Sequence, residues 1–209
     1  TVTGADQTGG VAGTFAKTAK MTGCYNGKNG TVEGQGTAGG VIGELASQHG
    51  ATAPLADCYN LGIVRGKENA GGVIGSVTQN LSALSGLYNA GKVYGTGEAT
   101  NTGGVIGQIS GRLKTMGGQI TGLYNQGLVD GGQGQYTGGV FGYVGPGMGS
   151  FIRGCYNDIS GNVVSAGQNV GGVMGMISAF AMPPLASTPG YCYNLGTVKG
   201  AGSETYAAG

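Results

Sequence analysis

The 209-residue chain has a net charge close to zero and is rich in glycine, and these two properties exclude several classes of function. It carries ten Lys and Arg against nine Asp and Glu, with no basic run that could displace counterions from nucleic acid. Anionic membranes and acidic substrates are disfavoured by the same balance, and no apolar run approaches the roughly 18 residues of a membrane span. Its 50 glycines, about 24% against a usual level of roughly 7%, lack the Gly-X-Y period of collagen.

Two short sequence words recur six times along the chain. The first, Gly-Gly-Val-x-Gly, begins at Gly9, Gly39, Gly71, Gly103, Gly138 and Gly171. The second begins with Tyr-Asn at Tyr25, Tyr59, Tyr88, Tyr124, Tyr156 and Tyr193. Repetition at a fixed period of this size indicates a solenoid, a propeller or a similar array.

The first word of each unit predicts a β-strand with one buried face. In the second unit Val41, Gly43 and Leu45 fall on alternate positions, and a period of two with β-branched residues on one parity indicates a strand. The central glycine is expected to leave room where opposite walls of a narrow core approach each other. The residues with this structural role are Gly39, Gly40, Val41, Gly71, Gly72, Val73, Gly103, Gly104, Val105, Gly138, Gly139, Val140, Gly171, Gly172 and Val173.

The position after these valines is also apolar and lies on the opposite parity. It is occupied by Ile42, Ile74, Ile106, Phe141 and Met174. We do not expect a row of this kind to be exposed to solvent without a contact partner, because exposed apolar patches usually mark contacts. Burial beneath the long loops, on a sheet covered on both faces, is the favoured prediction, and a protein or inter-domain interface is the alternative.

Between the two words, alternate units carry longer segments that contain Pro and Gly and predict loops. The loops at 51–56, 112–119 and 180–190 are candidate ligand-binding segments, because insertions in repeat proteins often lie on the binding face. His49 is the single histidine and lies in a Gly- and Pro-flanked loop segment. It is predicted to be a solvated loop residue.

The second word is also strand-like, and the position before its tyrosine holds either Cys or Leu. The six occupants are Cys24, Cys58, Leu87, Leu123, Cys155 and Cys192. This exchange indicates a buried apolar slot, in which a cysteine acts as a small apolar residue. Disulfides between neighbouring coils, Cys24 with Cys58 and Cys155 with Cys192, are the alternative.

The tyrosine and asparagine of the second word predict two further rows. Asn26, Asn60, Asn89, Asn125, Asn157 and Asn194 are expected to pair amide to amide down a stack. Tyr25, Tyr59, Tyr88, Tyr124, Tyr156 and Tyr193 admit two interpretations. The favoured one is a stacked ladder covered by loops, and the other is an exposed aromatic row that binds sugar rings or protein partners.

Together these elements predict an all-β single domain over residues 1–209, a β-solenoid of six repeats with roughly one coil per 30–37 residues. One unit cannot bury its own apolar face, whereas six units stacked about 4.8 Å apart form a continuous interior roughly 28 Å long. A six-bladed β-propeller is the alternative, although its blades usually need about 40 or more residues. The chain begins near the first word and ends after the last, so we expect a segment of a longer protein.

The words resemble the GLUG motif, a repeat that reads approximately Gly-Gly-Leu/Val-x-Gly and then Ser/Cys-Tyr-x-x-Gly-x-Val-x-Gly. The first half of the motif is matched by GGVIG beginning at residues 39, 71 and 103, by GGVFG at 138 and by GGVMG at 171. The second half is matched by CYNLGIVRG, which begins at Cys58, and by CYNLGTVKG, which begins at Cys192. The chain departs from the family in having Val where Leu is frequent and Asn after Tyr where Ala is common.

This resemblance implies a non-catalytic structural or adhesive module of a bacterial cell-surface or secreted protein, acting as a stalk or display scaffold. GLUG repeats are found in adhesin-like proteins and in regions outside the catalytic domain of immunoglobulin A peptidases. Expected partners are host or matrix glycans or proteins and the neighbouring domains of the parent chain. The alternatives are a glycan-binding module that uses the tyrosine row or the long loops, and a substrate-positioning region of a surface peptidase.

No catalytic or metal-binding pattern competes with the repeat. A single histidine restricts HExxH and Ser-His chemistry, and the scattered carboxylates specify no facing pair of the glycosidase kind. The cysteines are more than 30 residues apart with no histidine nearby, which disfavours zinc. We therefore expect no enzymatic activity and no cofactor.

Overall fold

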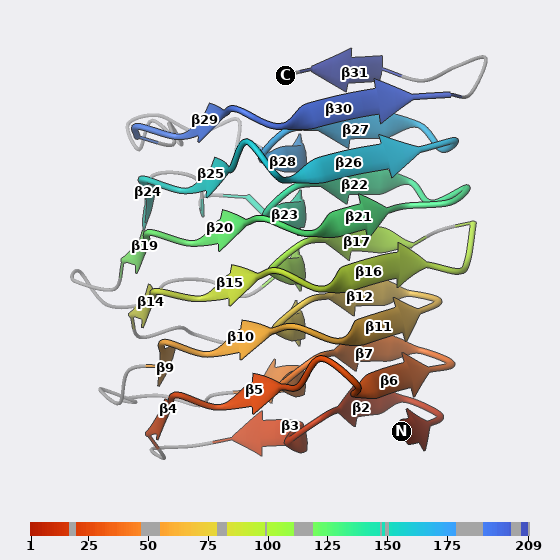
Figure 1. The fold of residues 1–209 in the computed structure, drawn as a ribbon, viewed down its shortest axis with the longest axis vertical. Helices are drawn as coiled ribbons and strands as arrows, with labels where there is room; N and C mark the ends of the chain where they lie inside the picture. Colours follow the sequence, from red (N-terminus) through yellow and green to blue (C-terminus); the bar gives the residue numbers. More distant parts are fainter. Residues whose placement is uncertain are drawn as a thin grey trace.

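The chain folds into a β-solenoid, in which successive repeats stack as coils along one long axis (Figure 1). The computed structural model describes residues 1–16, 20–46, 55–78, 83–98, 100–110, 119–146, 148, 151–178, 190–201 and 206–208. Strands of one repeat pair with the equivalent strands of the next repeat. This arrangement confirms the predicted solenoid and excludes a propeller, whose strands would pair within each blade. No helix in the described ranges is long and apolar enough to cross a membrane.

The coils contribute to five parallel sheets, named here A to E in the order in which the chain visits them. Sheet A contains β1 (Val2–Gly4), β6 (Thr31–Gly34), β11 (Ile63–Gly66), β16 (Lys92–Gly95), β21 (Leu128–Asp130), β26 (Asn162–Ser165) and β30 (Thr197–Gly200). Sheet B contains β2 (Gln7–Gly9), β7 (Thr37–Gly39), β12 (Asn69–Gly71), β17 (Asn101–Gly103), β22 (Tyr136–Gly138), β27 (Asn169–Gly171) and β31 (Tyr206–Ala208).

The remaining three sheets complete each coil. Sheet C contains β3 (Ala12–Ala16), β8 (Ile42–Ala46), β13 (Ile74–Val77), β18 (Ile106–Ile109), β23 (Phe141–Val144) and β28 (Met174–Ile177). Sheet D contains β4 (Met21–Thr22), β9 (Leu55–Ala56), β14 (Leu84–Ser85), β19 (Ile120–Thr121) and β24 (Ile152–Arg153). Sheet E contains β5 (Tyr25–Asn26), β10 (Tyr59–Asn60), β15 (Tyr88–Asn89), β20 (Tyr124–Asn125), β25 (Tyr156–Asn157) and β29 (Tyr193–Asn194).

Pairing is in register, so each repeat residue lies directly over its equivalent in the next coil. Tyr59 pairs with Tyr25 in sheet E, and Val64 pairs with Val32 in sheet A. Successive asparagines of sheet E are separated by 34, 29, 36, 32 and 37 residues, close to the expected coil length. The differences are absorbed outside the sheets, which is how coils of unequal length keep one register.

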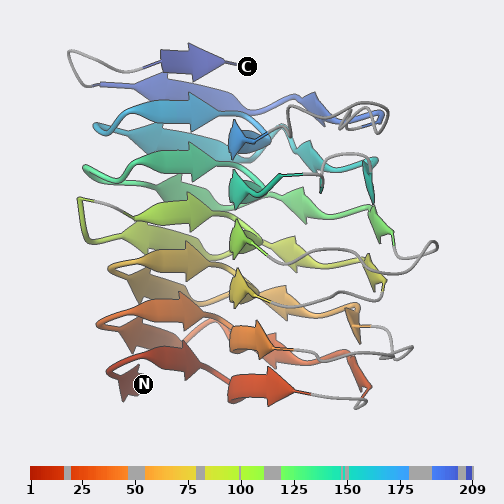
Figure 2. The same cartoon turned by 180° about the vertical axis from the view of Figure 1, so that it is seen from behind.

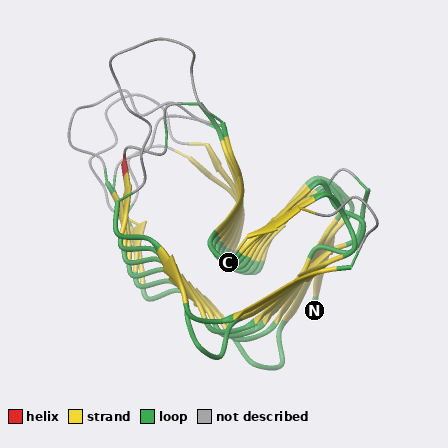
Figure 3. Ribbon diagram, turned by 90° about the horizontal axis from the view of Figure 1, so that it is seen from above, coloured by secondary structure: helices red, strands yellow, loops and turns green. Residues whose placement is uncertain are grey.

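Seen along its axis, the solenoid has two lobes joined at a re-entrant corner (Figure 3). Sheets C, D and E enclose the larger core, which includes Ile74, Leu84 and Leu87. Sheets A and B enclose smaller clusters such as Ala38, Val64, Ala70 and Val93. The corner lies where the chain passes from sheet B to sheet C through the Gly-Gly-Val word.

Glycine is needed at this corner because two sheets and a side-chain ladder meet there. A Cβ on Gly72 would lie 2.8 Å from Oδ1 of Asn89 in sheet E. A Cβ on Gly75 would lie 2.6 Å from the Gly43 carbonyl oxygen and 2.8 Å from the carbonyl carbon of Ala38. At both positions, therefore, a side chain could be accommodated only if the backbone shifted.

The prediction that the central glycine faces a narrow core is wrong. The position of a Cβ on Gly75 would also meet Cγ2 of Thr37, whose side chain lies on the outer side of sheet B, opposite the core residue Ala38. Two sheets do approach each other closely at Gly75, but the surfaces that meet are the outer faces of sheets B and C at the corner. The glycine lets the two sheets fold back onto each other.

The predicted opposition of the valine and isoleucine rows is also wrong. Pairing in sheet C runs from Ile74–Ile106 to Ser76–Gln108 and skips the glycines. This irregular step breaks the alternation, so Val73, Ile74 and Val77 all lie in the same core. Four members of the apolar row, Ile42, Ile74, Ile106 and Phe141, are 0% exposed, and Met174 packs against the same core partly buried. The row is interior, so it does not form the alternative contact surface.

The first and last described coils lie at opposite ends of the stack, as the rear view also shows (Figure 2). Each of these coils has a neighbour on one side only. Val11 is 51% exposed, whereas its equivalent Val41 in the next coil is fully buried. The interior coils are therefore the best packed part of the molecule.

Candidate functional site

An asparagine ladder runs along the junction of the two lobes and confirms the predicted amide pairing. Asn60 Nδ2 donates to Asn89 Oδ1 at 2.7 Å, and Asn89 Nδ2 donates to Asn125 Oδ1 at 2.7 Å. Each of these amides also bonds its own turn, as where Gly91 N donates to Asn89 Oδ1 at 3.2 Å. The side chains of Asn60, Asn89 and Asn125 are 0% exposed, so this ladder is structural and unavailable to a ligand.

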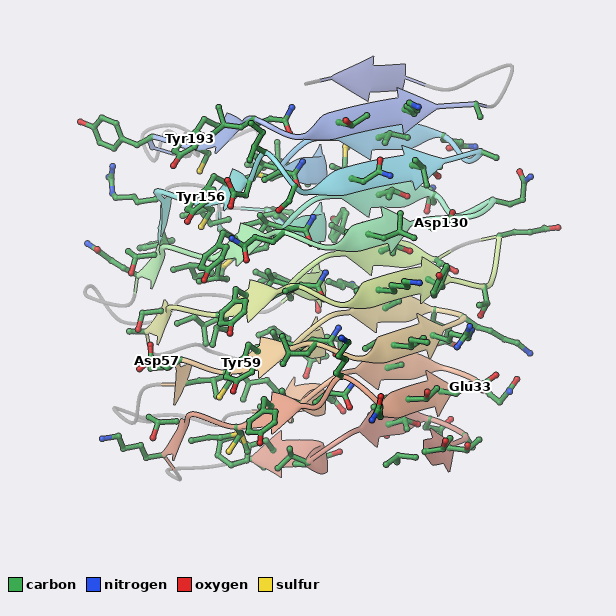
Figure 4. The ribbon with its side chains drawn as sticks, in the orientation of Figure 1. Glu33, Asp57, Tyr59, Asp130, Tyr156 and Tyr193 are labelled. Carbon is green, nitrogen blue, oxygen red and sulfur yellow. The ribbon has the colours of Figure 1, made fainter. Side chains whose placement is uncertain are left out.

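The tyrosines of sheet E form a continuous stack on the outer surface (Figure 4). Consecutive ring centroids lie 4.8–5.1 Å apart, with interplanar angles of 2–10°. The terminal rings, Tyr25 and Tyr193, are 53% and 48% exposed, and the four rings between them are half-buried. The stacked ladder is thus present, and its outer edge is partly exposed along its length.

Because the tyrosine rings stack on one another, most of their faces are not available to bind a ligand. Interior rings such as Tyr59 and Tyr88 have a neighbouring ring over both faces, whereas packing against a sugar ring requires a free aromatic face. What remains is a column of ring edges and phenol groups. Partial burial, with a smaller contribution from neighbouring tyrosines, raises the pKa of Tyr88, Tyr124 and Tyr156 above its usual value. The phenols therefore stay neutral at physiological pH.

The four cysteines are free thiols, arranged as two pairs of neighbours. The backbone pairing of Tyr59 with Tyr25 and of Tyr156 with Tyr193 places Cys58 beside Cys24 and Cys155 beside Cys192. Burial raises the pKa of the Cys58 thiol to about 11. A hydrogen bond from the Cys155 thiol lowers the pKa of Cys192 to about 6, while Cys155 itself is shifted upward. The slot is apolar, as expected.

A second row of side chains, missed by the sequence analysis, lies on the outer side of the re-entrant corner. We call it the corner seam. It consists of one outward residue from sheet B and one from sheet C in each of the second to sixth coils. The members are Thr37, Asn69, Asn101, Tyr136 and Asn169 in sheet B, and Glu44, Ser76, Gln108, Tyr143 and Met176 in sheet C.

Side-chain contacts show that the two rows of the corner seam face each other. Asn101 Nδ2 donates to Asn69 Oδ1 at 2.8 Å along one row and to Gln108 Oε1 at 3.4 Å across the seam. Asn69 and Ser76 point away from the core and are nevertheless only 9% and 6% exposed. The outer surface is therefore concave at the corner. In the third coil its side chains fill this concavity, and from Asn101 onward they are half-buried or exposed.

In the fifth coil the corner seam carries two aromatic rings. Tyr136 and Tyr143 lie with ring centroids 5.6 Å apart and an interplanar angle of 29°. Both are half-buried. The sequence signal that could have identified them is their departure from the repeat, since the coils before and after place Asn101 and Asn169 in sheet B and Gln108 and Met176 in sheet C at these two positions. Only in β31, at the end of the stack, does sheet B again place a tyrosine, Tyr206, at this position among the described residues.

Several polar groups of the corner seam make no hydrogen bond to the described residues. Within the described part of the chain, no hydrogen bond is made by the Tyr136 and Tyr143 hydroxyls, the Asn169 side chain or the Gln108 amide nitrogen. Gln108 lies one coil before the aromatic pair and Asn169 lies one coil after it. The arrangement combines partly covered aromatic surface with several hydrogen-bonding groups, which is the usual composition of a small-molecule site.

The other sequence-based candidates lie largely outside the described residues. These include His49 and most of the loops at 51–56, 112–119 and 180–190. Among the residues that the structure describes, no group of three or more His, Cys, Asp or Glu side chains could hold a metal ion.

Comparisons with known proteins give one structural neighbour. No protein-family model matches the chain, and no curated protein matches it. A solved structure from Bacteroides ovatus, named as an immunoglobulin A1 protease, is similar with a TM-score of 0.41 and 15% sequence identity. The similarity covers 79% of this chain and 61% of that one, so this chain spans less than two thirds of its neighbour. At this level the comparison assigns neither a family nor an activity.

Proposed function

We propose that this chain is a non-catalytic structural and adhesive repeat module of a bacterial cell-surface or secreted protein, related to GLUG-motif repeat regions. In this role the solenoid acts as a stalk or display scaffold that separates the regions attached to its two ends. Its partners are host or matrix glycans or proteins and the neighbouring domains of the parent chain.

The observation that carries this proposal is the unbroken ladder along the axis. Side chains of the repeat are used to join one coil to the next, as in the asparagine chain from Asn26 to Asn194. The two termini lie at opposite ends of the stack (Figure 1), so the length of the rod sets the distance between attached domains. A linear array of this kind is stabilised coil by coil through nearest-neighbour contacts.

The scaffold role is tested by changing the length of the rod. Removing residues 71–137 joins Ala70 to Gly138, which occupies the register position of Gly71, and deletes two coils. The chain and this variant are each fused between a membrane anchor and a fluorescent domain, and energy transfer to a membrane dye reports the height of that domain. A scaffold predicts a height lower by roughly 10 Å in the variant, two coil spacings. An unchanged height in a folded variant contradicts the scaffold role.

The non-catalytic part of the proposal has its own test. The purified chain is incubated with intact immunoglobulin A and with a casein substrate, and the products are separated by gel electrophoresis. We expect no new fragments. New fragments whose amount follows the chain through gel filtration, and which are absent with the heat-denatured chain, would contradict it.

A further inference from the structure

We propose that the corner seam, between the fourth and sixth coils, is a binding site for a neutral oligosaccharide. This inference deepens the adhesive part of the proposed function and is independent of the scaffold part. The site consists of the aromatic pair Tyr136 and Tyr143, with Asn101 and Gln108 one coil before it and Asn169 one coil after it.

Stacking of the coils does not require these two tyrosines. The equivalent positions in neighbouring coils hold Asn101 and Asn169 in sheet B and Gln108 and Met176 in sheet C. Both departures from the repeat occur in the same coil, and the two rings contact each other across the corner. By contrast, the tyrosines of sheet E recur in every coil and stack on their equivalents.

The aromatic pair also differs from the rest of the corner seam in its hydrogen-bonding groups. Elsewhere in the corner seam the amides are paired, as where Asn69 Nδ2 donates to Thr37 Oγ1 at 3.2 Å. Around the aromatic pair, the two phenol hydroxyls, the Asn169 amide and the Gln108 amide nitrogen make no hydrogen bond to the described protein residues. Half-buried polar groups are normally satisfied by protein, water or ligand.

The chemistry of these side chains as a group suits a sugar. Amides and phenols supply both donors and acceptors, which matches the alternating donor and acceptor character of sugar hydroxyls. A tyrosine ring offers an apolar surface beside its polar hydroxyl, which suits the C–H face of a pyranose. The site residues Asn101, Gln108, Tyr136, Tyr143 and Asn169 are all uncharged, so a neutral sugar fits better than a sialylated or sulfated one.

The experiment is a glycan array probed with the intact 209-residue chain, followed by titration calorimetry with the glycan bound best. The site variants are Tyr143→Ala and Asn169→Ala, and Tyr94→Ala is the control. Tyr94 is a half-buried tyrosine on the outer side of sheet A, where it contacts Arg65. Thermal denaturation of each variant separates a lost site from a lost fold, and Tyr143→Phe removes only the hydroxyl.

We expect saturable binding to a neutral glycan that is unaffected by salt, since screening acts on charges. Tyr143→Ala should weaken it at least about tenfold, the effect of losing an aromatic anchor. Asn169→Ala should weaken it less, and Tyr94→Ala should leave it unchanged. Binding only to charged glycans or to deglycosylated protein overturns the proposal, as does no glycan binding or full affinity in folded Tyr143→Ala. None of these outcomes alters the rod-length test, so failure of the site and failure of the scaffold are distinguishable.

Discussion

At the scale of single residues, the same amino acid serves different purposes according to the side of the strand on which it lies. Asn89 is interior and links Asn60 to Asn125 in a hydrogen-bonded chain, whereas Asn169 lies on the outer surface and its amide bonds none of the described residues. Tyr88 is held between two other rings, whereas Tyr143 contacts one ring across a corner. Repetition at a position marks a structural role, and a departure from the repeat at an outer position marks a candidate for binding.

Replacing Asn89 with alanine should destabilise the fold by about 1–3 kcal/mol, because it leaves buried polar groups of Asn60 and Asn125 without their partner. The free energy of unfolding is measured by urea denaturation. Asn162→Ala is the matched control, since Asn162 is an exposed residue of sheet A and its loss should change stability by less than about 0.5 kcal/mol. Equal effects in the two variants would show that the ladder contributes nothing.

Cysteine reactivity should depend on pH in a way that distinguishes the paired thiols. The pKa of Cys192 is lowered to about 6 by the Cys155 thiol, so Cys192 is largely thiolate above that pH. The pKa of buried Cys58 is raised to about 11, so it stays protonated at neutral pH. Because the thiolate is the nucleophile, iodoacetamide at pH 7 should alkylate Cys192 well before Cys58, as followed by peptide mass spectrometry.

Two results bear on this prediction. The rate at Cys192 should change little between pH 7 and pH 8.5, since ionisation is already nearly complete. A rate that rises about tenfold per pH unit over that range would mean that the Cys192 pKa is not lowered. Cys155→Leu, which places at that position the residue that Leu123 supplies in the preceding coil, should return the pKa of Cys192 toward its ordinary value.

At the scale of structural elements, the fold depends on the corner between sheets B and C. Without glycine there, the two sheets could not approach closely enough for Asn101 to reach Gln108 across their outer faces. The corner therefore creates the lobed cross-section and the corner seam together. An element that looks purely structural in the sequence positions the candidate binding residues.

Gly75→Val should test this corner directly. The added side chain would meet Cγ2 of Thr37 at 2.5 Å and the Gly43 carbonyl oxygen at 2.6 Å, and overpacking of this kind costs about 1–3 kcal/mol. Gly27→Val is the control, because the nearest atom to a Cβ there is 3.9 Å away. Thermal unfolding should occur at a lower temperature in Gly75→Val only. Unchanged stability of that variant would mean that the corner tolerates a side chain.

At the scale of the whole molecule, the sequence predicts the solenoid, its coil length and its ladders, because those depend on residues that recur in register. The pairing of Asn60 with Asn89 follows from repetition alone. The orientation of Gly75 and the burial of Ile74 do not, because the irregular step in sheet C overrides the period of two. The contact between Tyr136 and Tyr143 was also inaccessible, since it depends on the angle at which two sheets meet.

The central claim, that the coils stack in parallel and in register, is tested most directly by distances between spin labels on the outer side of sheet D. Labels replace Thr22 and Arg153, which are four coil steps apart in that sheet, in a background where the four cysteines are leucine. Pulsed electron paramagnetic resonance should give a narrow distribution centred near about 19 Å, four times the strand spacing. A broad distribution, or one centred beyond about 30 Å, would contradict the stacked solenoid.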